Sequence, residues 1–237
     1  MASRPAAGGG RWVEVPPERL ERWFVGFAER HGVDRTTIGR PAPARPDAGG
    51  AGPDSAGGRI DMVTVYGADA AIAECHLPFP PLVVGDRNPL DALIAHAAVD
   101  RRVGVFLVRL GGYAAGIFAG TELVASKVDQ RQVHGRNKAG GWSQQRFARR
   151  REGQARQLTE AAAAVAERVL LPEVAALDAV VLGGDRTAVD AALATPTLAP
   201  LRALAVERFL TVPDPRRAVL DATPATFRAT RIRVVDP

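Results

Sequence analysis

The sequence predicts an α/β protein with a mixed sheet, in which an antiparallel meander is followed by β-α units. Three strand-like runs, 103–110, 113–119 and 121–130, are separated only by short glycine-containing turns, as in a tight meander. A long run with apolar residues at helical spacing follows over 144–170, and strand-like and helical segments then alternate. Hydrophobic residues make up 46% of the chain, so a sizeable core is expected.

The segments before the meander predict a helix and a hairpin. Apolar side chains recur at helical spacing over 16–31, with prolines at the start and Gly32 after the end, which indicates an amphipathic helix. Two strand-like runs, 60–65 and 70–76, flank a Tyr-Gly-Ala-Asp turn and predict a hairpin. A helix opened by Asn88 or Pro89 is expected to run to about residue 98.

Two regions lack the composition of a packed structure, and they suggest a domain division. Residues 1–10 are expected to form a disordered tail. Between Gly39 and Gly58 nearly every residue is Gly, Ala, Pro, Ser, Asp or Arg, which buries too little apolar surface to offset the ordering entropy. We therefore expect 1–58 to hold a tail, a helix and a linker, and 59–237 to form one domain with a basic loop at 131–146.

The run after the meander predicts a helix of about 40 Å at 1.5 Å per residue. It ends before Pro172, and its apolar side chains share one side: Phe147, Ala155, Leu158, Ala162, Val165 and Val169. The elements expected after it are a strand at 179–182, a helix to 193, a strand at 206–212, a helix at 215–222 and a strand at 227–235. Gly183-Gly184-Asp185 lacks the lysine and the glycine spacing of nucleotide-binding loops, so we interpret it as a strand-to-helix turn.

Positive charge is concentrated in one stretch, 127–156. It holds nine Lys or Arg against two acidic residues, whereas the rest of the chain holds 22 basic and 24 acidic residues. Within it, Arg146, Arg149 and Arg150 share a helix face because they are spaced i, i+3 and i+4. Such a local excess favours binding to a phosphate backbone over an ordinary solvated helix face.

Composition excludes several classes of function. The single cysteine, Cys75, permits no internal disulfide, and the four histidines show no metal-ligand spacing, so we expect neither a metal nor a cofactor. No apolar run is long enough to cross a bilayer, and the first ten residues lack a signal-peptide core. We therefore expect a cytoplasmic protein that does not bind membranes and is a monomer.

The centre of the basic stretch, AGGWSQQRFARRR over 139–151, has the features of a catalytic loop. The pair Gly140-Gly141 permits backbone conformations closed to other residues and brings N–H groups close to a substrate. A neighbouring glutamine cannot act as a general base, but its amide both donates and accepts hydrogen bonds, so it can orient water. Such a loop needs a substrate that supplies most of the active site.

These residues resemble a known family. Gly140-Gly141 and a following glutamine, then Arg146-Phe147-Ala148-Arg149, are similar to the Gly-Gly-Gln loop and helix in the central domain of eukaryotic and archaeal class I release factors. The match is nearer to the VLRF-type peptidyl-tRNA hydrolases, in their stand-alone actinobacterial branch. Trp142 then counts as an insertion and Ser143-Gln144 matches Gly-Gly-Ser-Gln. The resemblance implies a release-factor central-domain (ribonuclease H-like) fold.

The resemblance also implies a function and roles for the residues. The activity would be release of nascent chains from stalled large ribosomal subunits by hydrolysis of peptidyl-tRNA, with Gln144 positioning water. Gly140 and Gly141 would offer N–H groups, and Ser143 would assist or cap the helix. The residues expected to hold rRNA or tRNA are Arg136, Lys138, Trp142, Arg146, Arg149, Arg150 and Arg151, with Trp142 either stacking on a base or anchoring the loop.

Alternatives remain open at this stage. Gln145 is adjacent to Gln144 and competes for the catalytic role. A tRNA or RNA endonuclease acting at the acceptor end, or a ribosome-binding factor without catalysis, would need the same basic surface. Asp61, Asp69 and Glu74 on the predicted hairpin could converge with another acid in a metal-dependent nuclease, although solvated strand edges are the simpler interpretation.

Overall fold

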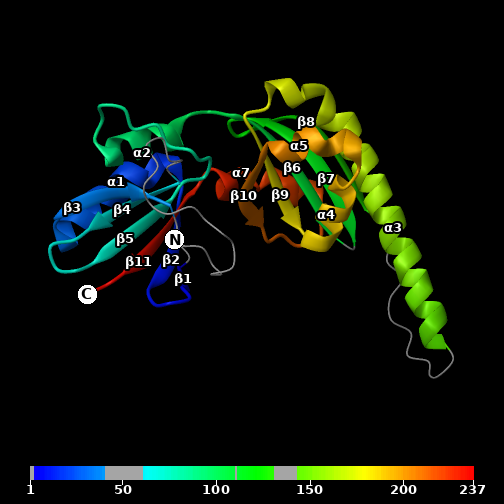
Figure 1. Cartoon of the computed structure of the whole chain (residues 1–237), viewed down its shortest axis with the longest axis horizontal. Coiled ribbons are helices and arrows are strands. Elements are labelled where there is room, and N and C mark those ends of the chain that lie inside the picture. Colours follow the sequence, from blue (N-terminus) through cyan, green and yellow to red (C-terminus); the bar gives the residue numbers. More distant parts are fainter. Residues whose placement is uncertain (1–2, 41–60, 110, 131–142) are drawn as a thin grey trace. The chain divides into compact units, whose positions relative to one another are not determined.

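The computed structural model describes residues 3–40, 61–109, 111–130 and 143–237, and for 143–152 it describes only the course of the helix. The chain forms two compact units, Met1–Val99 together with Arg228–Pro237, and Asp100–Phe227 (Figure 1). Most of the predicted linker, from residue 41 onward, lies outside the described residues.

The first unit is a six-stranded sheet in the order β1-β2-β11-β5-β4-β3, and every neighbouring pair is antiparallel. Its elements are β1 Ser3–Pro5, β2 Arg11–Val15, α1 Pro17–His31, β3 Arg35–Gly39, β4 Met62–Tyr66, β5 Ile72–His76, α2 Pro89–Ala98 and β11 Thr230–Val235. Leu20, Phe24 and Phe27 of α1 are buried with alternate residues of the strands, so the predicted aromatic stripe is confirmed as a core-facing one.

The amino-terminal tail was predicted wrongly as disordered. Ser3–Pro5 forms β1, which pairs with β2 across a turn of three glycines at positive φ. A side chain at Gly10 would place its Cβ 2.3 Å from the carbonyl oxygen of Val234, so glycine is required for this close approach. Pairing of β1 with β2, which is itself paired with β11, thus supplies order that the local composition does not indicate.

The last strand exists as predicted, but it belongs to a different sheet from the one expected. β11 lies between β2 and β5 in the first unit, whereas a continuation of the β-α units was expected. The hairpin of β4 and β5 joins the same sheet through β11 and β3. Because these strands pair with the amino-terminal ones, the chain divides at Val99/Asp100 and at Phe227/Arg228, not at the predicted 58/59 boundary.

The second unit confirms the mixed sheet. Its strand order is β10-β9-β6-β7-β8, with β6, β7 and β8 antiparallel, β9 parallel to β6, and β10 parallel to β9. The elements are β6 Arg102–Arg109, β7 Gly112–Ala119, β8 Glu122–Gln130, α3 Ser143–Val169, η1 Leu171–Ala176, β9 Ala179–Gly184, α4 Arg186–Leu193, η2 Pro196–Leu198, α5 Ala199–Ala203, β10 Ala205–Leu210, α6 Arg217–Asp221 and α7 Pro224–Phe227.

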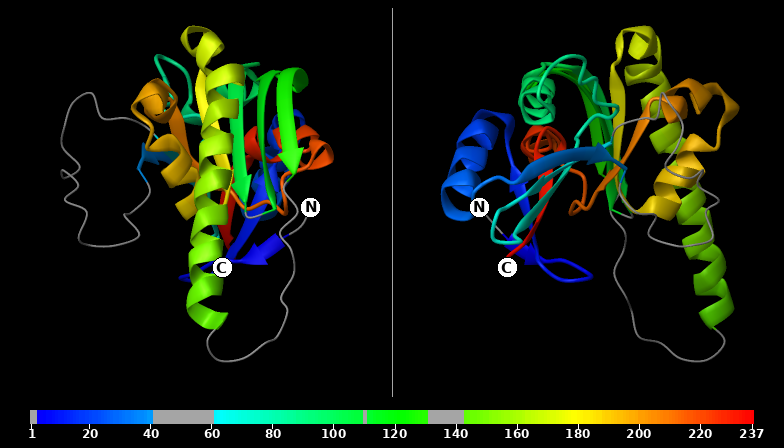
Figure 2. Two further views of the ribbon diagram at one scale, coloured as in Figure 1. Left: turned by 90° about the vertical axis from the view of Figure 1, so that its right-hand side faces the viewer. Right: turned by 60° about the vertical axis from the view of Figure 1, so that its left-hand side comes forward.

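Helices cover both faces of this sheet (Figure 2). On one face, α3 and α4 bury Leu158, Ala162 and Val189 in the same cluster as Phe106 and Ile117 of the strands. The other face carries Phe118, whose ring meets that of Phe227 of α7 edge-on, with ring centroids 5.6 Å apart. A sheet held between two helical layers gives the meander a rigid base.

The turn after β9 is structural, as predicted. Gly184 has a φ of 104°, and a Cβ there would lie 2.1 Å from the carbonyl oxygen of Val108. Asp185 then caps α4, because its carboxylate accepts a hydrogen bond from the backbone N–H of Ala188 at 2.9 Å. The two glycines therefore serve close packing at the end of the sheet.

Candidate functional site

The catalytic loop predicted from the sequence lies largely outside the described residues. Arg136, Lys138, Gly140, Gly141 and Trp142 fall in 131–142. Ser143, Gln144, Gln145, Arg146, Arg149, Arg150 and Arg151 lie in the first turns of α3, where the helical course is described and the side chains are not. Their roles stay predictions. The structure describes the two elements that flank the loop in the sequence, β8 before it and α3 after it.

The helix after the loop is confirmed, since α3 covers Ser143–Val169 against the predicted 144–170. Its packed part begins at Leu158, and Leu158, Ala162, Ala163, Val165 and Ala166 are buried. Small alanines let the helix approach the sheet closely. Ala155, which was expected on the packed side, is exposed.

The first half of α3 extends past the end of the sheet (Figure 1). Leu170 lies beside the start of β6, because a Cβ at Gly104 would be 3.5 Å from Leu170 Cδ2. From Leu170 back to Leu158 the helix rises about 18 Å, roughly the length of the strands beneath it. The segment 143–157 therefore forms a helical arm of about 22 Å beyond the sheet.

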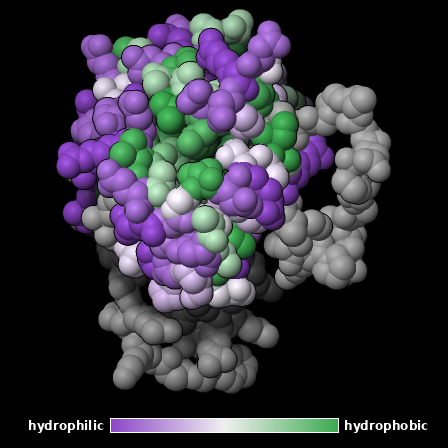
Figure 3. All heavy atoms as spheres, turned by 90° about the vertical axis from the view of Figure 1, so that its left-hand side faces the viewer, coloured by the Kyte–Doolittle hydropathy of each residue, from purple (hydrophilic) through white to green (hydrophobic). Residues whose placement is uncertain are grey.

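The net charge of the chain resides entirely in the second unit. By sequence, Asp100–Phe227 holds 18 basic and 13 acidic residues, and the remaining residues hold 13 of each. Figure 3 shows the side of the first unit, where hydrophobic side chains gather in the middle and hydrophilic ones lie around them. Because the basic excess lies within 127–156, the arm and the loop are where an anionic polymer would bind.

The other stem of the loop is β8, an edge strand that ends at Gln130. One residue earlier, Asp129 lies directly opposite Tyr113 of β7. The Tyr113 hydroxyl donates a hydrogen bond to Asp129 Oδ2 at 3.2 Å, and the tyrosine is 4% exposed. This pair was not predicted from the sequence.

The carboxylates considered for a metal-dependent nuclease each have a basic partner. Asp61 Oδ2 lies 4.0 Å from Arg40 Nε, and Glu74 Oε2 accepts from Arg233 Nη1 at 2.8 Å. Asp69 Oδ2 lies 2.8 Å from His31 Nδ1. Among the residues that the structure describes, no group of three His, Cys, Asp or Glu side chains is arranged to hold a metal ion.

The histidines and the cysteine of the first unit have structural surroundings. Cys75 is fully buried in the sheet, and this burial raises the pKa of its thiol. The negative charge of the nearby Glu74 carboxylate raises this pKa further, by a smaller amount. Burial also lowers the pKa of His76, as does Arg231, and its ring meets Trp12 edge-on at 5.0 Å. A thiol held neutral in this way is a poor nucleophile.

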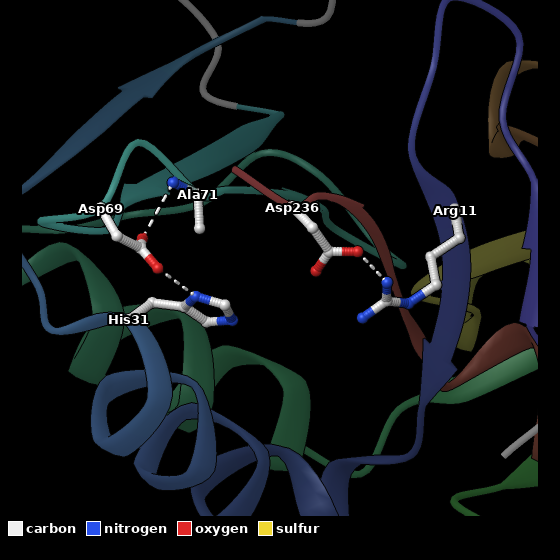
Figure 4. Close-up of polar contacts among 5 residues, drawn as sticks. All are labelled: Arg11, His31, Asp69, Ala71 and Asp236. Atoms are coloured by element: carbon white, nitrogen blue, oxygen red, sulfur yellow. Dashed lines mark hydrogen bonds and ion pairs between the residues drawn. The ribbon is translucent and has the colours of Figure 1, made fainter.

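Asp69 makes the pH-sensitive contact of the first unit (Figure 4). Its hydrogen bonds with His31 and with the Ala71 N–H lower its pKa, the His31 bond having the larger effect. The ionised form is thus favoured in the folded state, so its contribution to stability is present above the unfolded pKa of about 4 and is lost as the pH falls below it.

We expect the difference in melting temperature between the wild type and Asp69→Asn to narrow as the pH falls from about 6 to about 3, because protonation of Asp69 progressively removes the carboxylate charge that asparagine lacks. Thermal unfolding followed by circular dichroism measures this difference. Asp86→Asn, at an exposed loop carboxylate, is the control. A difference in melting temperature that stays constant between about pH 6 and about pH 3 would contradict a stabilising role of the ionised Asp69.

Comparison with known proteins gives a family match that covers the second unit from residue 101 and runs into β11 of the first unit. Residues 101–233, more than half of the chain, match the family model described as Actinobacteria/chloroflexi VLRF1 release factor. A comparison with curated proteins gives no match. No helix among the described residues has both the length and the apolar character needed to span a membrane.

Three solved structures also match at low similarity. An archaeal translation termination factor, aRF1, aligns with a TM-score of 0.39 and 14% identity over 69% of this chain and 51% of that one. A second archaeal protein gives a TM-score of 0.37 and 14% identity over the same shares. Dom34 of S. cerevisiae, a translation termination-like factor, aligns with a TM-score of 0.34 and 7% identity over 93% of this chain and 65% of that one. The chain thus spans about half the length of the first two.

Proposed function

The chain belongs to the Actinobacteria/chloroflexi VLRF1 release factor family, and from this premise we propose that it is a ribosome-rescue peptidyl-tRNA hydrolase. It would free nascent chains from stalled large ribosomal subunits in the cytoplasm, acting as a monomer without a metal or cofactor. The observation that carries the proposal is that the basic excess of the sequence falls on and directly before a helical arm that extends from a rigid mixed sheet.

The arm suits entry into a narrow RNA-lined site. A single helix is about 10–12 Å across with its side chains, and 143–157 is about 22 Å long, so the arm reaches well beyond the sheet. Arg146, Arg149, Arg150 and Arg151 lie in this segment and would meet phosphates of rRNA or tRNA. Arg136 and Lys138 would do so from the loop, and Trp142 would stack on an unpaired base.

The chemistry proposed is hydrolysis of the ester that joins the peptide to the terminal ribose. Gln144 would hold a water molecule against the ester carbonyl, with Gln145 as the adjacent candidate. Water adds to the carbonyl carbon, the bond to the ribose 3′ oxygen breaks, and the proton ends on that oxygen. The N–H groups of Gly140 and Gly141, with RNA groups of the subunit, would stabilise the negative oxygen of the intermediate. Ser143 would cap the helix behind the loop.

The test is peptide release from purified large subunits that carry peptidyl-tRNA. We expect the protein to release the peptide and to leave a tRNA whose 3′ end is an intact CCA. A shortened 3′ end would instead show phosphodiester cleavage and identify an endonuclease. Subunit binding without any release would identify a binding factor that lacks catalysis.

A further inference from the structure

We propose that Tyr113 and Asp129 form an anchor that positions the catalytic loop, an inference that rests on the proposed function. The two residues lie at the point where β8 passes into the loop, and neither belongs to the loop itself. They would act through the backbone of β8, without touching the substrate. They are therefore positioning residues.

The geometry of the pair fixes the end of an otherwise exposed strand. Among the described strands, β8 is at the edge of the sheet and pairs only with β7. Tyr113 and Asp129 are directly opposite in the register, and the phenol donates to Asp129 Oδ2 at 3.2 Å. Because Asp129 is followed by one last strand residue, this bond holds the final residues of β8 before the loop begins.

The residue types indicate that the contact has a purpose beyond strand formation. Aspartate is disfavoured in strands, and Asp129 is one of only two acids in the basic stretch 127–156. Its negative charge weakens the attraction of that stretch for phosphate. A buried tyrosine hydroxyl, on the other hand, needs an acceptor, and Asp129 supplies one.

The tyrosine also connects the two stems of the loop. Its side chain belongs to the buried cluster that includes Leu158 and Ala162, where the packed part of α3 begins. Its hydroxyl holds the end of β8. One buried residue, Tyr113, thus contacts β8 through its hydroxyl and shares a core cluster with α3. A catalytic group keeps its geometry only when the elements that carry it are fixed in this way.

The kinetic test uses Tyr113→Phe and Asp129→Ala in peptide release from large subunits. We expect kcat to fall roughly tenfold, within the hundredfold that lost positioning can cost, while KM for the subunit stays unchanged. Asp129→Asn keeps an acceptor oxygen and should recover much of the rate. Tyr66→Phe, at the only other tyrosine of the chain, is the matched control.

A second readout separates failure of the anchor from failure of the proposed function. Amide hydrogen exchange at residues 127–130 of the free protein should become roughly fivefold faster in Tyr113→Phe, the factor that one ordinary hydrogen bond supplies. If the wild type releases no peptide, the proposed function fails, but this exchange still tests the anchor. Unchanged exchange overturns the anchor, and faster exchange with an unchanged kcat overturns its positioning role.

Discussion

Replacing Gln144 by alanine is expected to slow peptide release about a hundredfold to a thousandfold while binding to the large subunit is retained. The loss of one preorganised hydrogen-bonding group that acts on the transition state typically has this effect. The amide carries no charge, so its removal leaves the arginine contacts to RNA intact. Single-turnover release from subunits at saturating protein measures the chemical step, and sedimentation of the protein with subunits measures binding.

The neighbouring amides provide the controls for this experiment. Gln145→Ala tests the adjacent candidate, and the double variant shows whether one amide substitutes for the other. Gln154→Ala changes the same residue type about 15 Å further along α3 and should leave release unchanged. If release by Gln144→Ala equals that of the wild type and Gln145→Ala loses it, the catalytic assignment moves by one residue. Full release by the double variant would contradict catalysis by the loop glutamines.

The strands and the long helix of the second unit were predictable because their signals are local, whereas the short helices η2, α5 and α7 were not predicted. Glycine-containing turns at 111–112 and 120–121 separate the three strands of the meander, and the long helix ends before Pro172. The periodicity of Leu158, Ala162 and Val165 identified the packed side of α3 correctly, since these residues are buried. Gly183-Gly184 lacks the nucleotide-binding spacing, and the structure explains the pair by close packing, of Gly183 against Leu210 and of Gly184 against Val108.

Partner choice between strands could not be read from local signals. β11 carries the alternation of a strand but nothing in its sequence specifies pairing with β2 and β5, residues that precede it by more than 150 positions. β1 is three residues long and ends in proline, so its order depends on β2. The domain boundary was missed for the same reason, because it depends on which sheet these strands join.

The Tyr113–Asp129 pair was hidden by an irregularity of the hairpin. The turn sets Ala119 opposite Glu122 and Phe118 opposite Leu123, a register that would place Tyr113 opposite Val128. A bulge between Ile117 and Phe118 shifts the register by one residue, so Ile117 faces Ala125 and Tyr113 faces Asp129. The only sequence signal was an aspartate in a strand beside a basic loop.

Changing Arg146, Arg149 and Arg150 together to alanine is expected to weaken binding to large subunits by two to three powers of ten at about 0.1 M salt. Each phosphate contact contributes roughly 0.7 to 0.9 to the slope of log affinity against log salt, so the slope should become shallower by about 2 to 3. The three residues share a helix face by their spacing, and α3 carries them on the arm beyond the sheet. A salt series of subunit binding measures both quantities.

The control must remove the same charge from elsewhere on the same unit. Arg168, Arg202 and Arg216 are exposed residues of the second unit outside the basic stretch, and changing them to alanine lowers the net charge equally. If the arm is the interface, this variant keeps nearly all of its affinity and its salt slope, because distant charges are screened beyond about 10 Å at 0.1 M salt. Equal losses in the two triple variants would show that net charge alone drives binding. A wild-type affinity that does not depend on salt would exclude RNA as the partner of the arm.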